Sequence, residues 1–288
     1  MVLRRYASLQ SPKISVLNII NKNFIVIFKE MELGLQNKNA LVCGSTQGIG
    51  KATAISLAKE GVNITLMARN EKVLQGVLKE LPQNGKQKHR YLVANFSDLD
   101  QIKNIISTNN SFHILVNNTG GPKSGAIIDA SVEEFSAAFQ MHVLVNQILS
   151  QAVVPFMKKE CFGRIINIIS TSVKEPIPGL GVSNTIRNAV ANWSKTMSSE
   201  LAEFGITMNN ILPGFTDTAR LDQIIKIKAT AANTSIEEMS KIMKNYVPAK
   251  RFAKPEETAA AVTFLASNSA SYITGVNLPV DGGRTKSL

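Results

Sequence analysis

Apolar and polar positions along the chain follow two alternating patterns from Asn37 onward. Short apolar runs have the length of buried strands, and the longer stretches between them have helical periodicity. The apolar runs are Ala40–Cys43, Ile64–Met67, Tyr91–Ala94, Ile114–Asn117, Arg164–Ile169, Thr207–Leu212 and Val276–Val280. The helical stretches are Lys51–Glu60, Glu71–Leu81, Leu99–Ser107, Val132–Lys159, Asn184–Phe204 and Glu256–Ala266. This alternation predicts an α/β fold, a doubly wound parallel sheet of seven strands with helices on both faces.

Polar residues mark where several of these helices begin. Asp98 and Ser131 each precede a run of apolar periodicity, and Ser131 with Glu134 has the spacing of a capping box. The segment Ala219–Tyr246 departs from the alternation, because it adds one or two helices rich in Ile, Met and Ala. Extra helices at this place in an α/β chain commonly cover a ligand crevice, so residues 219–247 are predicted to form a substrate lid.

The composition favours a cytoplasmic enzyme with one large core. A chain of 288 residues, 44% of them hydrophobic, buries enough surface to fold without disulfides or a structural metal. Its two cysteines cannot form a disulfide framework, and no Cys/His cluster has the spacing of a zinc site. The longest apolar runs, such as Phe24–Phe28, are far shorter than a membrane-spanning helix. We therefore expect no metal and no membrane partner.

The net charge of +11 is spread out rather than clustered. Residues 1–30 hold five cations and one carboxylate, and the remaining +7 contains no basic run. This distribution argues against nucleic acid as a partner and favours a smaller anion, such as a phosphorylated cofactor. We interpret residues 1–34 as an extension that precedes a domain of residues 35–288. Residues 1–30 fit a disordered tail, an overcalled start before Met31, or an organellar presequence rich in arginine and poor in acid.

A glycine-rich loop connects the first predicted strand to the first predicted helix. Glycines are needed there because the chain turns tightly and its backbone N–H groups must approach a pyrophosphate at the helix N-terminus. A strand before the loop and a helix after it indicate a dinucleotide-binding turn. We expect the whole loop to contact the cofactor: Gly44, Ser45, Thr46, Gln47, Gly48, Ile49 and Gly50.

The turn after the second strand bears on the choice of cofactor. A free ribose 2′-hydroxyl is usually bound there by an acidic residue, whereas a 2′-phosphate requires a cation. Arg69 supplies a planar guanidinium at this turn, and no acidic residue precedes Glu71. The turn therefore favours NADP(H) over NAD(H), unless Arg69 is a solvated loop residue.

Four motifs follow one another along residues 35–284. They are Gly44-x-x-x-Gly48-x-Gly50, Asn117-Asn118-Thr119-Gly120, Pro213-Gly214 and Asp281-Gly282-Gly283. With these motifs the chain resembles the short-chain dehydrogenase/reductase family, and within it the 3-oxoacyl-(acyl-carrier-protein) reductase branch. The resemblance implies a Rossmann-type domain, a homotetramer or homodimer, and hydride transfer between nicotinamide and a carbonyl or alcohol. It also implies cofactor contacts from Asn95, Phe96, Asn118, Gly120, Pro213, Gly214, Thr216 and Thr218.

The catalytic centre departs from the pattern of that family. The family has a Tyr-x-x-x-Lys motif at a set interval after a serine that ends the fifth strand. Counting from Ser170 leads instead to Ser183 and Arg187, and the helix asparagine of the family falls near His142. A serine hydroxyl reaches less far than a phenol and is a poor general acid, because its pKa is far too high. Arginine keeps the positive charge but cannot relay a proton.

Two other side chains are candidates for the proton donor. Lys174 lies four residues after Ser170, and the nearby charge of Arg187 would lower the pKa of its amine. His142 is the second candidate, because histidine titrates near neutrality. Each also fits a structural interpretation, a solvated loop lysine and a buried core histidine. We expect Ser170 to orient the substrate oxygen and Arg187 to anchor the nicotinamide ribose. Arg69, Lys174 and Arg187 are then predicted to converge on one crevice.

Two functions fit these residues. The first is an NADP(H)-dependent carbonyl reductase that acts on a small-molecule or acyl-carrier-bound substrate through an atypical centre. Its catalytic candidates are Ser170, Lys174, Ser183, Arg187 and His142. The second is a dinucleotide-binding protein with little or no turnover that acts as a sensor or as a partner in an assembly. Intact nucleotide motifs beside an altered centre are compatible with both.

Overall fold

Seven parallel strands form a single sheet in the order β3-β2-β1-β4-β5-β6-β7. The computed structural model describes residues 32–287, so the interpretations of residues 1–30 lie outside the described residues. The strands are β1 (Asn39–Cys43), β2 (Asn63–Ala68), β3 (Arg90–Val93), β4 (Ile114–Asn117), β5 (Gly163–Ile168), β6 (Ile206–Pro213) and β7 (Asn277–Val280). The central strands β4 and β5 are buried along their whole length, and the edge strands β3 and β7 are not. The predicted seven-stranded α/β fold is therefore confirmed.

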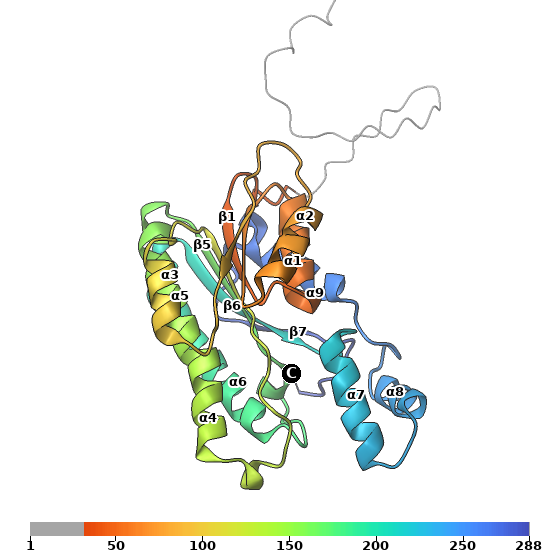
Figure 1. Ribbon diagram of the computed structural model, residues 1–288. Coiled ribbons are helices and arrows are strands. Elements are labelled where there is room, and N and C mark those ends of the chain that lie inside the picture. Colours follow the sequence, from red (N-terminus) through yellow and green to blue (C-terminus); the bar gives the residue numbers. More distant parts are fainter. Residues whose placement is uncertain (1–31, 288) are drawn as a thin grey trace, which may run out of the picture. The chain divides into compact units, whose positions relative to one another are not determined.

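Helices cover both faces of the sheet. They are α1 (Gly48–Lys59), α2 (Glu71–Glu80), α3 (Leu99–Ser107), α4 (Val132–Phe139), α5 (Val145–Lys159), α6 (Gly181–Leu201), α7 (Ala219–Ala231), α8 (Ile236–Asn245) and α9 (Pro255–Ala266). Figure 1 shows α1, α2 and α9 on one side of the sheet and α3 to α6 on the other. Side chains such as Ile102, Leu149 and Met157 are buried against the strands, and each stabilises the fold by about 1.5–3 kcal/mol.

Two helices lie within residues 219–247, the segment predicted to form a substrate lid, and they are called the lid helices here. Helices α7 and α8 pack on each other through a small apolar cluster of their own, which includes Leu221, Ile225, Met239 and Met243. Figure 1 shows this pair at the end of β6 and β7, beside the carboxyl edge of the sheet. The lid is therefore placed where ligands bind in parallel α/β sheets.

The predicted helix starts are present, but two helices differ from their predicted form. Ser131 and Glu134 form the capping box, and the Asp98 side chain accepts from the Gln101 N–H. The stretch predicted as one helix, Val132–Lys159, contains a π-helical turn at Gln140–Leu144 (η2), because one extra residue is accommodated between α4 and α5. Helix α6 begins at Gly181 rather than at Asn184, which places Ser183 in its first turn.

Four asparagines lie side by side across β4, β5, β6 and β7. Asn117 pairs in register with Asn167, Asn167 with Asn210, and Asn210 with Asn277. Their amides hydrogen bond in series at 2.8, 2.9 and 2.8 Å, with each Nδ2 donating to the Oδ1 on the next strand. Because buried amides need partners, this asparagine ladder fixes how the four strands align.

Within residues 32–287, no helix combines the length and the hydropathy needed to cross a membrane. The same residues contain no group of three or more His, Cys, Asp or Glu side chains placed to hold a metal ion.

Candidate active site

The loop between β1 and α1 has the backbone of a phosphate-binding turn. Gly44 and Gly48 have φ values of +57° and +53°, which residues with a side chain rarely adopt. A Cβ on Gly50 would collide with the Gly44 carbonyl and lie 2.6 Å from the Asn118 amide nitrogen. The N-cap Gln47 makes no side-chain cap hydrogen bond, so the first N–H groups of α1 remain available to an anion.

Asn118, the residue after β4, ties this loop to the centre of the sheet. Its Nδ2 donates to the carbonyl oxygens of Cys43 and Gly44, both at 3.2 Å. Ser45 is fully buried, and its Oγ accepts from the Met67 N–H at 3.1 Å. The loop is therefore held from β2 and from β4 before any ligand binds.

Three predicted cofactor residues lie farther along the same edge of the sheet. Arg69 is exposed after β2. After β3, the Asn95 side chain accepts from the Ser97 N–H at 3.1 Å, and Phe96 packs against the apolar core. None of the three lines the cavity described next. Their contacts with the adenosine end of a dinucleotide stay a prediction.

A cavity of about 330 Å³, here called the inner cavity, lies at the carboxyl ends of β1, β4, β5 and β6. Its lining includes thirteen of the predicted site residues: Gly44, Gln47, Gly48, Ile49, Asn118, Gly120, Ser170, Ser183, Arg187, Pro213, Gly214, Thr216 and Thr218. Ser45, Thr46 and Gly50 belong to the loop but do not line the cavity. Residues separated by more than a hundred positions in the sequence therefore meet in one space.

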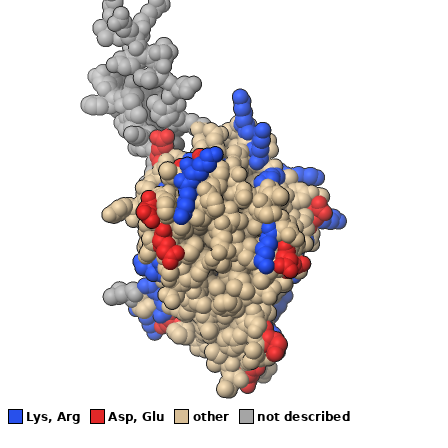
Figure 2. Space-filling model, turned by 90° about the vertical axis from the view of Figure 1, so that its left-hand side faces the viewer, with Lys and Arg blue, Asp and Glu red and all other residues tan. Residues whose placement is uncertain are grey.

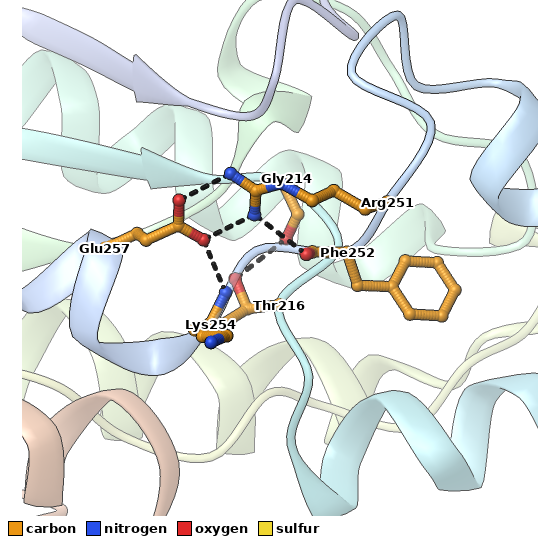
Figure 3. Close-up of polar contacts among 6 residues, drawn as sticks. All are labelled: Gly214, Thr216, Arg251, Phe252, Lys254 and Glu257. Carbon is orange, nitrogen blue, oxygen red and sulfur yellow. Dashed lines mark hydrogen bonds and ion pairs between the residues drawn. The ribbon is translucent and has the colours of Figure 1, made fainter.

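The loop that follows β6, residues 213–218, lies beside the segment 251–257, and Figure 3 shows polar contacts within each of the two. The Ala253 N–H donates to the Phe215 carbonyl at 2.9 Å. Arg251 donates through both terminal nitrogens to the Glu257 carboxylate at 2.6 Å, which lowers the pKa of Glu257 to about 2. The Thr216 Oγ1 donates to the Gly214 carbonyl at 3.3 Å. The Ala253–Phe215 bond ties the loop to its neighbour, and the Arg251–Glu257 pair lies within that neighbouring segment.

Two serine hydroxyls face the inner cavity from different elements. Ser170 follows β5, and its Oγ accepts from the Ser172 N–H at 3.0 Å. This bond fixes the oxygen and leaves the hydroxyl hydrogen free to donate. Ser183 lies in the first turn of α6, and its hydroxyl forms no hydrogen bond with the described residues. Both hydroxyls are therefore available to a ligand.

Arg187 brings a buried positive charge to the same cavity. The residue is 7% exposed, and its Nη1 donates to the Ile168 carbonyl at 3.1 Å. Its Nε is buried without a partner. Burial, and to a smaller extent the charge of Arg220, lowers the pKa of Arg187 to about 10, so the guanidinium stays charged at neutral pH. A buried guanidinium with a free donor is poised to bind an anion or a polar ligand.

His142 does not have the properties predicted for a proton donor. It is buried in the π-helical turn, and its Nδ1 lies 2.7 Å from the Thr119 hydroxyl oxygen. Burial, reinforced by the charge of Arg187, lowers the pKa of His142 to about 2, and its Nε2 has no partner. The expectation that it titrates near neutrality is therefore wrong, because the neutral form alone tolerates this environment.

The predicted convergence of Arg69, Lys174 and Arg187 is not found. Of these three, only Arg187 lines the inner cavity. Lys174 is the C-cap of a short 3-10 turn, Thr171–Val173 (η3), that carries the chain away from the cavity. The cations that accompany Arg187 are two that sequence reasoning missed, Arg220 and Arg284.

Both missed arginines are fixed by neighbouring groups. The Arg220 Nη2 donates to the Pro122 carbonyl at 2.9 Å, across the mouth of the cavity. The Arg284 Nη1 donates to the Thr171 hydroxyl at 3.0 Å, and its guanidinium lies 4.6 Å from the centre of the Phe215 ring. The Asp281-Gly282-Gly283 motif is the one local signal for Arg284, because its turn directs the next residue back over the sheet.

A second and larger space of about 1040 Å³, the outer groove, adjoins the inner cavity. It lies between the loop 175–180 and the lid helices α7 and α8, with apolar walls that include Ile227, Met239 and Ile242. Arg284 lines both spaces, and Lys228, Lys286 and Glu175 line the groove alone. A substrate that reached Ser170 would extend along this groove.

Comparison with known proteins identifies the family. The sequence profile of a family described as enoyl-(acyl carrier protein) reductase matches residues 44–285. The chain is also 35% identical over 253 residues to the 3-oxoacyl-(acyl-carrier-protein) reductase FabG of Haemophilus influenzae, covering 86% of this chain and 98% of that protein. The chain belongs to the short-chain dehydrogenase/reductase family. It is therefore an oxidoreductase that acts on carbonyl or alcohol groups with NAD(P)H.

Two further relatives extend the similarity of this short-chain dehydrogenase/reductase. The NADPH-dependent reductase BacG of Bacillus subtilis is 31% identical over 259 residues, covering 88% of this chain and 100% of that protein. The crystal structure of L-sorbose reductase from Gluconobacter frateurii, complexed with NADPH and L-sorbose, has a TM-score of 0.83. It is 28% identical and covers 90% of this chain and 100% of that chain.

The residues present fit a dinucleotide in this short-chain dehydrogenase/reductase. The glycine turn leaves no room for a Cβ at position 50, and a Cβ at position 214 would lie 2.7 Å from the Asp281 Cα. Glycines at such positions let the backbone pack closely around the pyrophosphate and the nicotinamide of a dinucleotide. Arg187 lines the same cavity, and its buried Nε has no partner among the described residues. The Gly44–Gly50 loop, Asn118 and the loop 213–218 would hold the cofactor.

Proposed function

We propose that this chain is an NADPH-dependent carbonyl reductase with an atypical catalytic centre. Ser183 and Arg187 take the places of the tyrosine and lysine of the family. Ser170, Ser183 and Arg187 support this assignment, because they line one cavity together with the glycine loop and the loop 213–218. When bound, the nicotinamide supplies the hydride, and all other steps depend on side chains of this chain.

The preference for NADPH rests on the turn after β2. Arg69 is exposed there and free to bind a 2′-phosphate, for which its planar guanidinium is suited. The acidic residue closest in sequence, Glu71, already accepts a hydrogen bond from the Tyr91 hydroxyl at 3.0 Å. A ribose hydroxyl would have to compete for that carboxylate. Among the relatives, BacG is an NADPH-dependent reductase and the L-sorbose reductase structure is a complex with NADPH.

Ser170 and Arg187 have different roles at the substrate carbonyl. The Ser170 hydroxyl donates to the carbonyl oxygen, because its own oxygen is already occupied by the Ser172 N–H. The Arg187 guanidinium stabilises the negative charge that develops on that oxygen and holds the nicotinamide ribose. A preorganised donor of this kind contributes about 3 kcal/mol to a transition state in a site shielded from water.

The proton comes from water in this proposal, by way of the Ser183 hydroxyl. Among the described residues that line the inner cavity there is no His, Lys, Tyr, Cys, Asp or Glu side chain. Lys174 lies outside that lining, and His142 is neutral. Ser183 acts only as a relay: its hydroxyl gives a proton to the alkoxide oxygen and takes one from water, and the hydroxide that remains passes to solvent.

The same lack of a titrating group favours the second function, a dinucleotide-binding protein with little or no turnover. NADPH binding and NADPH consumption, measured in parallel on a panel of carbonyl compounds, separate the two. A reductase consumes NADPH on at least one carbonyl class. Binding without consumption on the whole panel supports the sensor or assembly partner, and restoring Tyr and Lys at positions 183 and 187 should then raise the rate.

Two matched variants test the roles within a reductase. Ser170→Ala should lower kcat by about a hundredfold with NADPH affinity unchanged, because it removes one donor to the developing oxyanion. Lys174→Ala, four residues away, should leave kcat within about twofold. A loss of turnover in Lys174→Ala would instead restore the lysine as proton donor.

We also propose that the chain self-associates through the face of α4 and α5, as its family resemblance suggests. Val132 and Phe139 of α4 are 75% and 41% exposed, and no charged residue lies between Glu134 and Lys158. Figure 2 shows this side of the molecule, with Lys, Arg, Asp and Glu gathered mainly at its edges. Exposed apolar surface of this kind marks interfaces. Val132→Glu should lower the mass measured by light scattering.

A further inference from the structure

The inner cavity holds three positive charges and no carboxylate. Arg187, Arg220 and Arg284 line it, and within residues 32–287 none of the three forms an ion pair. The Nη2 atoms of Arg187 and Arg220 each lie 3.9 Å from the position of a Cβ on Gly121. The two nitrogens are therefore at most about 8 Å apart, and like charges at such a separation repel each other unless an anion lies between or beside them. The cavity is therefore built for more negative charge than its own residues supply.

Two of these arginines have other contacts. Arg187 holds the ribose in the proposed function, and the Arg220 Nη2 donates to the Pro122 carbonyl at 2.9 Å. Arg284 is different, because it lines the inner cavity and the outer groove at their junction. Its guanidinium donates to the Thr171 hydroxyl at 3.0 Å and lines the inner cavity together with Ser170, the residue proposed to orient the substrate carbonyl.

The carboxylate nearest in sequence to Arg284 does not neutralise it. Asp281 accepts from the Gly283 N–H at 3.0 Å and from the Thr285 N–H at 2.8 Å, so both oxygens are directed at backbone. The Phe215 ring supports one face of the Arg284 guanidinium and keeps its plane fixed. A planar guanidinium held in this way matches a carboxylate by paired hydrogen bonds.

We propose that the substrate is a free oxo acid whose carboxylate is bound by Arg284. The inference rests on the proposed carbonyl reduction and narrows its substrate class. Because Ser170, Thr171 and Arg284 line the same inner cavity of about 330 Å³, a carboxylate on Arg284 and a carbonyl on Ser170 belong to one short molecule, such as a 2-oxo or 3-oxo acid. A carrier-bound thioester has no charge at that distance from its carbonyl. The apolar body of the acid occupies the outer groove, whose rim carries Lys228 and Lys286.

Binding of a carboxylate that cannot be reduced tests this site without turnover. Calorimetry compares hexanoate with hexanamide, each with and without saturating NADPH. The wild-type protein should bind hexanoate at least about tenfold more tightly, and Arg284→Gln should bring the two ligands within about twofold. Lys286→Gln removes a charge from the groove rim alone and should keep the preference. Equal affinity in the wild type, or a preference that survives in Arg284→Gln, overturns the proposal.

Arg284→Lys tests whether the result for Arg284→Gln comes from a change in structure instead of the loss of the guanidinium. It keeps the charge but loses the planar pair of donors, so the hexanoate preference should fall several-fold with the melting temperature within a few degrees of wild type. An unchanged preference in this variant also overturns the proposal.

Turnover separates this inference from the proposed function. Rates of NADPH oxidation are compared for 2-oxohexanoate, 3-oxohexanoate and their methyl esters. A kcat/KM for an acid that is at least about tenfold higher than that for its ester supports both the reductase and the carboxylate site. Esters reduced as well as the acids leave the reductase standing and overturn the carboxylate site. A hexanoate preference without reduction of any carbonyl leaves the anion site standing and overturns the reductase.

Discussion

His142 should make the folded protein less stable as the pH falls below about 6.5. Burial, followed by the charge of Arg187, lowers its pKa from 6.5 to about 2 in the folded state. A histidine of this kind contributes stability that is complete above its unfolded pKa and is lost as the pH falls toward the folded pKa. Each pH unit below the pKa of the unfolded state lowers the free energy of unfolding by about 1.36 kcal/mol. The loss attributable to His142 near pH 5 is therefore about 2 kcal/mol.

His142→Asn isolates this contribution. Asparagine cannot be protonated, and its amide can still bond to the Thr119 hydroxyl that lies 2.7 Å from the histidine Nδ1. Urea unfolding is followed through the fluorescence of Trp193, the single tryptophan of the sequence, at about pH 7.5 and at about pH 5. The two proteins are compared at one concentration, because self-association would shift the apparent stability.

The wild-type protein should lose about 2 kcal/mol more than the variant between these two pH values. His113, whose pKa is also lowered by burial, is present in both proteins and cancels in the difference. Equal losses of unfolding free energy in the two proteins would refute the inference that His142 is buried in its neutral form.

Three other substitutions test the sheet and the cofactor site. Asn167→Leu leaves the two neighbouring amides of the asparagine ladder without partners and should lower the free energy of unfolding by about 2–4 kcal/mol, measured with denaturant. Gly50→Ala should abolish NADPH binding in a fluorescence titration, whereas Gly76→Ala, which meets nothing within 4 Å, should not change it. Arg69→Ala should raise the Kd for NADPH by about tenfold and leave that for NADH within twofold. Equal effects on both cofactors would show that Arg69 does not contact the 2′-phosphate.

The fold and the phosphate loop are predictable from the sequence because their signals are local. The run Ala40–Cys43 has the apolar character of a buried strand, and the glycines that follow have few other uses between a strand and a helix. The Ser131 capping box likewise needs only four consecutive residues. Each of these features is decided by neighbours in the chain.

The charges of the site are not predictable in this way. Arg284 lies far from Thr171 in the sequence and reaches the Thr171 hydroxyl only because of the turn after β7. Lys174 is near Ser170 in sequence, but η3 intervenes and takes it out of the cavity. The environment of His142 depends on the π-helical turn, and helical periodicity does not resolve a single added residue. Tertiary packing decides which cations meet.

The asparagine ladder has a further consequence for the site above it. Its three hydrogen bonds run in one direction, from β4 toward β7, so reversing one amide would set like groups face to face. The four side chains can therefore reverse only together. A strand that slipped by one residue would turn its asparagine to the opposite face of the sheet. The asparagine ladder thus keeps in register the strand ends that lead to Asn118, Ser170 and Pro213. Its own amides line neither the inner cavity nor the outer groove.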